Sequence, residues 1–213
     1  MTYSAPNILT LDLSGSNKIR NVMICKIVKE LEDLQTFICL RNPLIGNDVL
    51  QTLATNCKKL TRLEIGGLAN DYSDDITLEG IETLALFKKP AGLKKVKIEY
   101  CTKVGDQAIQ FISKRFYHCL EEISIIRNYY EKAARISDEA FLYLQNCPLL
   151  QKIEIFYSRK FDEKLAVNLS QNFLKLRVLN LAFCPVHVSL EPLSYGCPNL
   201  EELNLMGDSW VKR

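Results

Sequence analysis

The sequence has little of what catalysis requires. It contains two histidines, His118 and His187, and its eight cysteines include no Cys-x-x-Cys pair. It has no metal-spaced set of Cys and His, no glycine-rich phosphate loop ahead of a lysine and no nucleophile elbow. A nucleophile built from Cys184 and His187 is the one enzymatic alternative, and it would need an exposed, activated thiolate. We therefore expect no enzyme activity, no cofactor and no metal site.

Long apolar runs and targeting signals are also lacking. No stretch approaches the roughly 18–20 apolar residues of a membrane span, and residues 1–6 lack the basic region and apolar core of a signal peptide. No Gly/Ser/Pro-rich linker or charge block divides the chain, whose formal net charge is +2. We expect one domain over residues 1–213, in the cytoplasm or nucleus, with no membrane partner.

One pattern is present eight times. An aliphatic or aromatic residue, or in one case cysteine, stands at i, i+3 and i+5, and a small polar residue or cysteine usually follows at i+8, as in Leu176, Leu179, Leu181 and Cys184. The repeats begin at Ile8, Leu34, Leu60, Leu93, Leu120, Leu150, Leu176 and Leu200. This period is typical of leucine-rich repeats, which stack into a solenoid. The sequence predicts an α/β horseshoe of about eight repeats, with parallel strands on the concave face and helices on the convex face.

The second half of each repeat predicts a helix. Ser137 and Thr77 are expected N-caps, because a hydroxyl can accept a hydrogen bond from an amide of the first helical turn. Cys57, Cys147 and Cys197 recur at one position of the repeat, just after the helix. We interpret these recurring cysteines as reduced, buried thiols and not as disulfide partners.

These motifs resemble a known class of repeat. A strand followed by Cys or Asn, then Ile-Ser-Asp at 136–138 and Asn-Cys-Pro-Leu-Leu at 146–150, is similar to the cysteine-containing leucine-rich repeats. That class is best known from F-box/leucine-rich-repeat proteins, which are substrate-recognition subunits of cullin–RING ubiquitin ligases. It also occurs in mitotic-exit-antagonist-type proteins, which lack an F-box. The resemblance implies a protein-recognition module, and it covers the chain from about Ile8 to Asp208.

The resemblance does not extend to an F-box. That domain would need a helical segment ahead of the first repeat, and only seven residues precede Ile8. Ligase components are expected partners only if an F-box lies in a longer chain. A ligase-independent scaffold, assembly factor or regulatory protein is the alternative.

The predicted binding site lies where the strands end. Side chains alternate along a strand, so equivalent residues of successive repeats form columns on the concave face. Two columns at the strand exits collect aromatic, methionine and arginine side chains, the composition of a protein-interaction hot spot. The predicted partner-binding residues, called the exit stripe, are Leu40, Arg41, Tyr100, Ile126, Arg127, Phe156, Tyr157, Phe183 and Met206. The alternative is that some of these rings fold over neighbouring loops and are half-buried.

Two further features bear on the partner. Extra residues at 69–75 and 129–135 predict two loops beside the exit stripe, and such insertions often lie on the binding face. The four concave columns contain six basic and six acidic residues, whereas a surface that tracks phosphates needs a sustained excess of basic residues. We therefore expect a protein partner and no nucleic acid.

Overall fold

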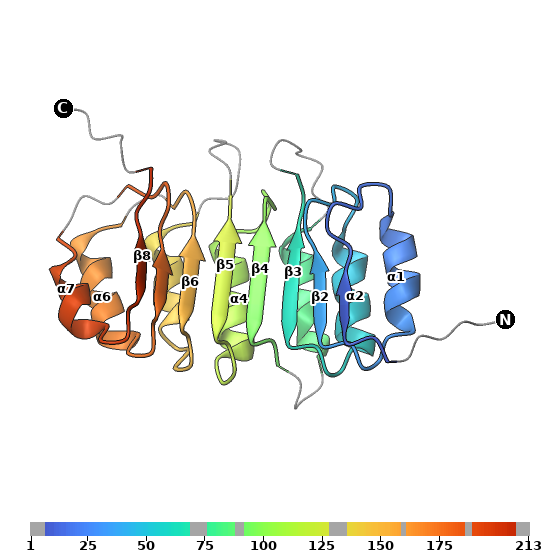
Figure 1. Cartoon of the computed structure of the whole chain (residues 1–213), viewed down its shortest axis with the longest axis horizontal. Helices are drawn as coiled ribbons and strands as arrows, with labels where there is room; N and C mark the ends of the chain where they lie inside the picture. Colours follow the sequence, from blue (N-terminus) through green and yellow to red (C-terminus); the bar gives the residue numbers. More distant parts are fainter. Residues whose placement is uncertain are drawn as a thin grey trace. The chain divides into compact units, whose positions relative to one another are not determined.

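The computed structural model describes residues 7–68, 76–87, 92–127, 136–158, 161–185 and 189–207 (Figure 1). The contacts within the chain divide it into two compact units, one ending at Val104 and the other beginning at Gly105.

The first unit contains a parallel sheet in which the strands follow chain order. Its strands are β1 (Thr10–Asp12), β2 (Thr36–Cys39), β3 (Arg62–Gly66) and β4 (Lys95–Glu99). Its helices are α1 (Asn21–Lys29), α2 (Asn47–Asn56) and α3 (Leu78–Glu82), the last continued by a 3-10 turn, η1 (Thr83–Leu86). Thr10, Thr36, Arg62 and Lys95 lie side by side, which confirms the predicted column.

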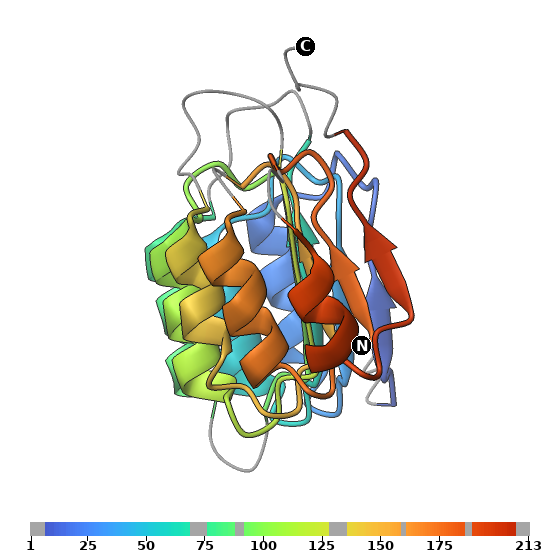
Figure 2. The same cartoon turned by 90° about the vertical axis from the view of Figure 1, so that its left-hand side faces the viewer.

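The second unit repeats this arrangement. Its strands are β5 (Glu122–Ile126), β6 (Lys152–Ile155), β7 (Val178–Asn180) and β8 (Glu202–Asn204). Its helices are α4 (Asp106–Phe116), α5 (Asp138–Leu144), α6 (Glu163–Asn172) and α7 (Glu191–Gly196). Here too, equivalent residues of successive repeats form a column, as predicted: Glu122, Lys152, Val178 and Glu202 are in register. In Figure 2, the helices of this unit lie on one side of its strands, as the α/β repeat pattern predicts.

The repeated apolar residues form the core between strands and helices. Leu60, Leu63 and Ile65 of the third repeat are completely buried, and the corresponding residues of the other inner repeats are nearly so. Burial of each such side chain stabilises the fold by about 1.5–3 kcal/mol. In β8, by contrast, Leu203 is 43% exposed, because no described strand or helix covers it from outside.

The polar residue at i+8 satisfies backbone groups inside the turn. Asn42 is fully buried. Its Nδ2 donates to the carbonyls of Ser16 (3.2 Å) and Ile19 (3.4 Å), while its Oδ1 accepts from the Leu44 amide (2.9 Å). A buried carbonyl without a hydrogen bond would be costly, so this position prefers a small polar side chain.

The recurring cysteines are core residues of the kind predicted. None of the eight cysteines forms a disulfide. The thiols of Cys57, Cys147 and Cys197 point at carbonyl oxygens of the preceding helix, 3.7–3.8 Å away. Burial raises the pKa of Cys57 and of Cys147 to about 12, so both thiols stay protonated at neutral pH.

Successive helices are joined at their first residues. In α4, Asp106 Oδ1 accepts from the Ser137 amide (2.9 Å) and Oδ2 accepts from its hydroxyl (2.6 Å). Ser137 also accepts from the Glu139 amide (3.2 Å), which confirms the predicted N-cap of α5. The prediction that the Thr77 hydroxyl caps α3 with a hydrogen bond is wrong. Thr77 precedes α3 as expected, but its hydroxyl accepts from the Asn47 amide group of α2 instead (2.9 Å).

Candidate protein-binding site

The strands end in a sharp backbone turn that the sequence pattern did not reveal. Six residues of one exit column have left-handed backbone angles. They are Gly15, Arg41, Tyr100, Tyr157, Phe183 and Gly207, with φ between +55° and +88°. This conformation suits glycine and costs other residues about 1–2 kcal/mol each. Four side chains of the exit stripe are therefore held at positions that local backbone preference opposes.

Acidic or amide side chains stabilise several of these turns. Asp12 Oδ1 accepts from the Ser14 amide at 2.9 Å, and Asn204 Oδ1 accepts from the Met206 amide at the same distance. Asn180 makes the equivalent bond to the Ala182 amide (3.2 Å). Hydrogen bonds from the Ser14 hydroxyl and amide hold the pKa of Asp12 below its usual value. These concave polar residues thus have a structural role at the strand exit.

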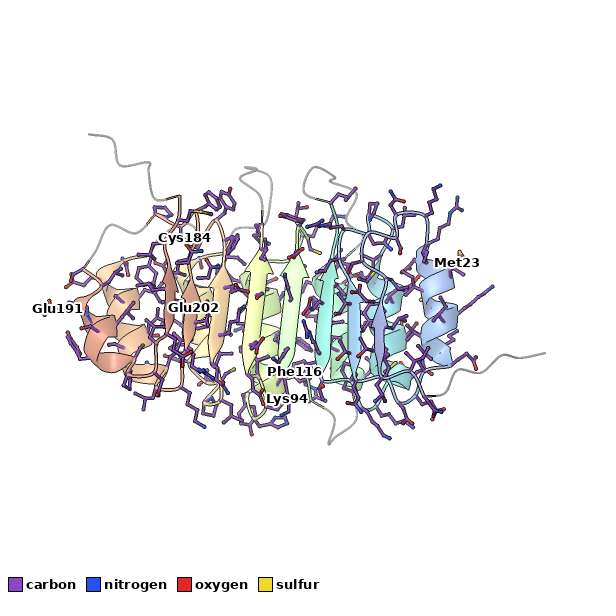
Figure 3. The ribbon with its side chains drawn as sticks, in the orientation of Figure 1. Met23, Lys94, Phe116, Cys184, Glu191 and Glu202 are labelled. Atoms are coloured by element: carbon purple, nitrogen blue, oxygen red, sulfur yellow. The ribbon has the colours of Figure 1, made fainter. Side chains whose placement is uncertain are left out.

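Four residues of the exit stripe come together in the second unit. This group, the exit cluster, consists of Phe156, Tyr157, Phe183 and Met206. The rings of Tyr157 and Phe183 stack with centroids 4.7 Å apart and planes within 4° of parallel. Phe156 meets Phe183 edge-on at 6.4 Å. The backbone fixes the spacing, since the Phe183 amide donates to the Met206 carbonyl (2.7 Å). Cys184, labelled in Figure 3, marks this exit edge.

The exit cluster is partly open to solvent. Phe156 and Tyr157 are half-buried, as the alternative interpretation of the rings expected, whereas Phe183 and Met206 are 37% and 61% exposed. The Phe183 ring lies directly over the backbone of Gly207, where an added Cβ would stand 2.2 Å from a ring carbon. Glycine is therefore needed at 207 for two reasons: φ is positive there, and a Cβ would collide with the Phe183 ring.

The other two residues of the exit stripe in the second unit are less accessible to a partner than Phe183 and Met206. Ile126 is half-buried. Arg127 is only 5% exposed, so the expectation that it faces solvent is wrong. Strand β5 ends at Ile126, and beyond the strand, alternation no longer sets the direction of a side chain.

The other three residues belong to the first unit. Arg41 is exposed, while Leu40 and Tyr100 are half-buried. Arg41 follows β2 and Tyr100 follows β4, so β3 lies between them. Within the first unit, these residues therefore do not form a cluster comparable to the one in the second unit.

Two glycines at the exit of β3 have a role that the sequence did not suggest. Gly66 and Gly67 are both buried. A Cβ at Gly66 would lie 2.5 Å from the Glu99 carbonyl oxygen. The Gly67 amide donates to that same oxygen at 3.1 Å. Glycine is thus required there by the close approach of two backbones.

Charged residues of the concave columns pair along a strand. Arg62 contacts Glu64 (2.5 Å), Lys97 contacts Glu99 (2.7 Å) and Lys152 contacts Glu154 (3.2 Å). Each of these ion pairs joins residues i and i+2 of one strand. Burial opposes ionisation of Glu154, but the Ser124 hydroxyl and Lys152 ammonium outweigh it and hold its pKa below the usual value.

The groups considered for chemistry are placed as follows. Cys184 is buried, and its thiol contacts the Ile155 carbonyl at 3.1 Å, while His187 lies outside the described residues. In the described ranges, no three His, Cys, Asp or Glu side chains are arranged to hold a metal ion.

No helix in these ranges has the length and apolarity needed to cross a bilayer. The two inserted loops, 69–75 and 129–135, are outside the described residues.

Comparison with known proteins supports the fold. A yeast structure of the Rad7 and Elc1 complex contains a chain with TM-score 0.61 and 15% identity, covering 83% of this chain and 43% of that one. Internalin C2 of Listeria monocytogenes gives TM-score 0.55 and 21% identity, over 95% and 75% respectively. These likenesses, with the parallel strands in register, show the α/β leucine-rich-repeat fold.

The sequence comparisons are more limited. No protein-family model matches the chain. The BTB/POZ domain-containing protein FBL11 of Arabidopsis thaliana is 27% identical over 173 residues, which are 80% of this chain. The match spans only 17% of that relative's length.

Proposed function

We propose that this chain is a protein-recognition module that binds its partner through the exit cluster. The observation that carries the proposal is the stacked pair of Tyr157 and Phe183, displayed beside the exposed Met206 on backbone turns of fixed geometry. Aromatic and methionine side chains are enriched at protein–protein interfaces, and tyrosine is among the residues enriched in binding hot spots. Because these rings are already ordered by stacking, binding costs them little conformational entropy.

The partner is a client protein of the kind that F-box/leucine-rich-repeat adaptors present to ubiquitin ligases. One observation favours this role: the recurring cysteines and the turn Asn resemble those of the cysteine-containing repeats. The repeat spacing runs on from residue 8 to residue 208, which supports a single domain over 1–213. A ligase-independent scaffold is the second candidate.

Affinity purification with mass spectrometry from the native cell tests this proposal. The test variant combines Tyr157→Gly and Phe183→Gly, which removes both rings and keeps residues that tolerate the left-handed turn. The control combines Tyr117→Ala and Tyr195→Ala, two exposed tyrosines of the same unit outside the exit cluster. Circular dichroism first establishes that both variants fold.

The outcomes separate the candidates. Loss of one client with the test variant alone supports recognition by the exit cluster. Retention of every partner by both variants refutes it. Cullin–RING subunits that remain bound to both variants favour the ligase adaptor, whereas a stable complex without such subunits favours the scaffold.

A further inference from the structure

The outer flank of α1 is a second surface of the first unit, distinct from the exit cluster. Ile24 and Val28 are fully buried in the core, and α2 packs against α1. Figure 1 shows α1 as the outermost helix of this unit, and Figure 3 labels Met23 on its outer side. Val22, Met23 and Ile27 are 63%, 53% and 38% exposed. The other helices in the described part of this unit leave fewer large apolar side chains uncovered.

Basic residues occur in and just before the helix that carries this apolar strip. The segment 13–29 contains Lys18, Arg20, Lys26 and Lys29 and no acidic residue. All four side chains are exposed, and none forms an ion pair with another described residue. Other cations of the same unit are neutralised, for example Lys59 by Asp33 at 2.7 Å. The acidic residues Glu30 and Glu32 follow only after the helix has ended.

Met23 and Ile27 lie in one row along the helix, and Lys26 and Lys29 lie in the neighbouring row, which begins with Val22. Met23 and Ile27 are four residues apart and therefore lie on one side of α1. Val22, Lys26 and Lys29 follow the adjacent row at the same helical spacing. A ligand that lies along α1 can thus bury apolar atoms on one row and meet positive charge on the next.

We infer that this flank binds an acidic amphipathic helix of a partner protein. A helix fits because α1 would pack against it as α2 packs against α1, with side chains spaced three and four residues apart. Glutamate or aspartate beside the apolar strip of that helix would neutralise Lys18, Arg20, Lys26 and Lys29.

Other ligands fit this surface less well. An anionic membrane is disfavoured because Ile24 and Val28, the apolar face that an interfacial helix would insert, are already buried in the core. A nucleic-acid backbone offers no apolar surface to cover Val22, Met23 and Ile27.

Fluorescence anisotropy with a synthetic peptide tests the inference. The probe is a labelled, helix-forming peptide of about 15 residues, with leucines at i, i+4 and i+7 flanked by glutamates. A scrambled peptide of the same composition, phosphatidylserine-containing vesicles and a short DNA duplex serve as competing ligands.

Two paired variants locate the site. Met23→Ala with Ile27→Ala removes the apolar row, and Lys26→Glu with Lys29→Glu reverses the basic row. Lys164→Glu with Lys175→Glu is the matched control, because both lysines are exposed and the change in net charge is the same. Circular dichroism checks the fold of each variant.

We expect the peptide to bind the wild type and the control equally, and each α1 variant about tenfold more weakly. Affinity should also fall as salt rises, because the charges are exposed. The inference is overturned if the peptide does not bind at about 1 mM or if the scrambled peptide binds as well. Preferred binding of vesicles or DNA, or an equal effect of the control variant, also overturns it. Loss of the exit cluster should leave peptide binding unchanged, so this result does not depend on the proposed function.

Discussion

Replacement of Arg41 by glycine should stabilise the protein, although glycine usually destabilises a fold. Arg41 has φ of +56°, in the left-handed region. Its side chain is exposed and makes no hydrogen bond or ion pair with another described residue, so its removal sacrifices few contacts. The substitution therefore reports mainly on the backbone of the strand exit.

The expected gain follows from two opposing terms. Relief of the left-handed conformation is worth about 1–2 kcal/mol. The greater conformational freedom of glycine in the unfolded chain destabilises the folded state by about 0.4–1 kcal/mol and so offsets part of this gain. The net effect is a stabilisation of about 1 kcal/mol for Arg41→Gly, whereas Arg41→Ala should have nearly no effect. In a chain of this size, about 1 kcal/mol raises the melting temperature by roughly 2–4 °C.

Urea denaturation followed by circular dichroism measures the two free energies of unfolding. Gln51, an exposed residue inside α2, provides the control with ordinary helical backbone. There, the glycine variant should be less stable than the alanine variant by about 1 kcal/mol. If Arg41→Gly is also less stable than Arg41→Ala, the left-handed turn does not carry the strain assigned to it.

Three further predictions concern the core, the helix connections and the exit cluster. Stability should decline as pH rises from about 9 towards 12, because the thiols of Cys57 and Cys147 ionise in the unfolded chain but stay protonated when folded. The urea midpoints at pH 8 and pH 11 should therefore differ less in a Cys57→Ala, Cys147→Ala variant than in the wild type. An equal difference in both proteins would contradict the raised pKa of these thiols. Asp106→Ala removes two hydrogen bonds to Ser137 and should cost about 2 kcal/mol by urea denaturation. Gln107→Ala, at the exposed neighbouring position, should change stability by less than about 0.5 kcal/mol. Gly207→Ala should destabilise more than Gly15→Ala in the same assay, because φ is positive at both but only Gly207 lies under a ring. Equal costs would show that Phe183 does not pack there.

Much of the fold could be predicted because a repeat restates the same physical requirement. Apolar residues at i, i+3 and i+5 recur with nearly constant spacing, and each must be buried against its neighbours. The pattern therefore predicts the strand register that places Arg62 beside Lys95. The buried thiols follow in the same way, since equivalent residues of successive repeats stack.

The candidate site could be predicted only in part. Composition and alternation located the exit stripe, and they correctly suggested that aromatic residues gather there. They could not show that Arg127 is buried, because alternation does not extend beyond the end of a strand. They also missed the need for glycine at 66, since the nearest atoms belong to Glu99, thirty-three residues further along the chain.

The sequence by itself determined the leucine-rich-repeat fold, the column in which each strand residue lies and the burial of the inner leucines and cysteines. These properties depend on local periodicity, which the chain carries in every repeat. Only the tertiary structure decided that Tyr157 stacks on Phe183, that Phe183 covers Gly207 and that α1 leaves a basic, apolar flank open. Such features depend on which side chains meet across neighbouring repeats, and spacing along one chain does not specify those distances and angles.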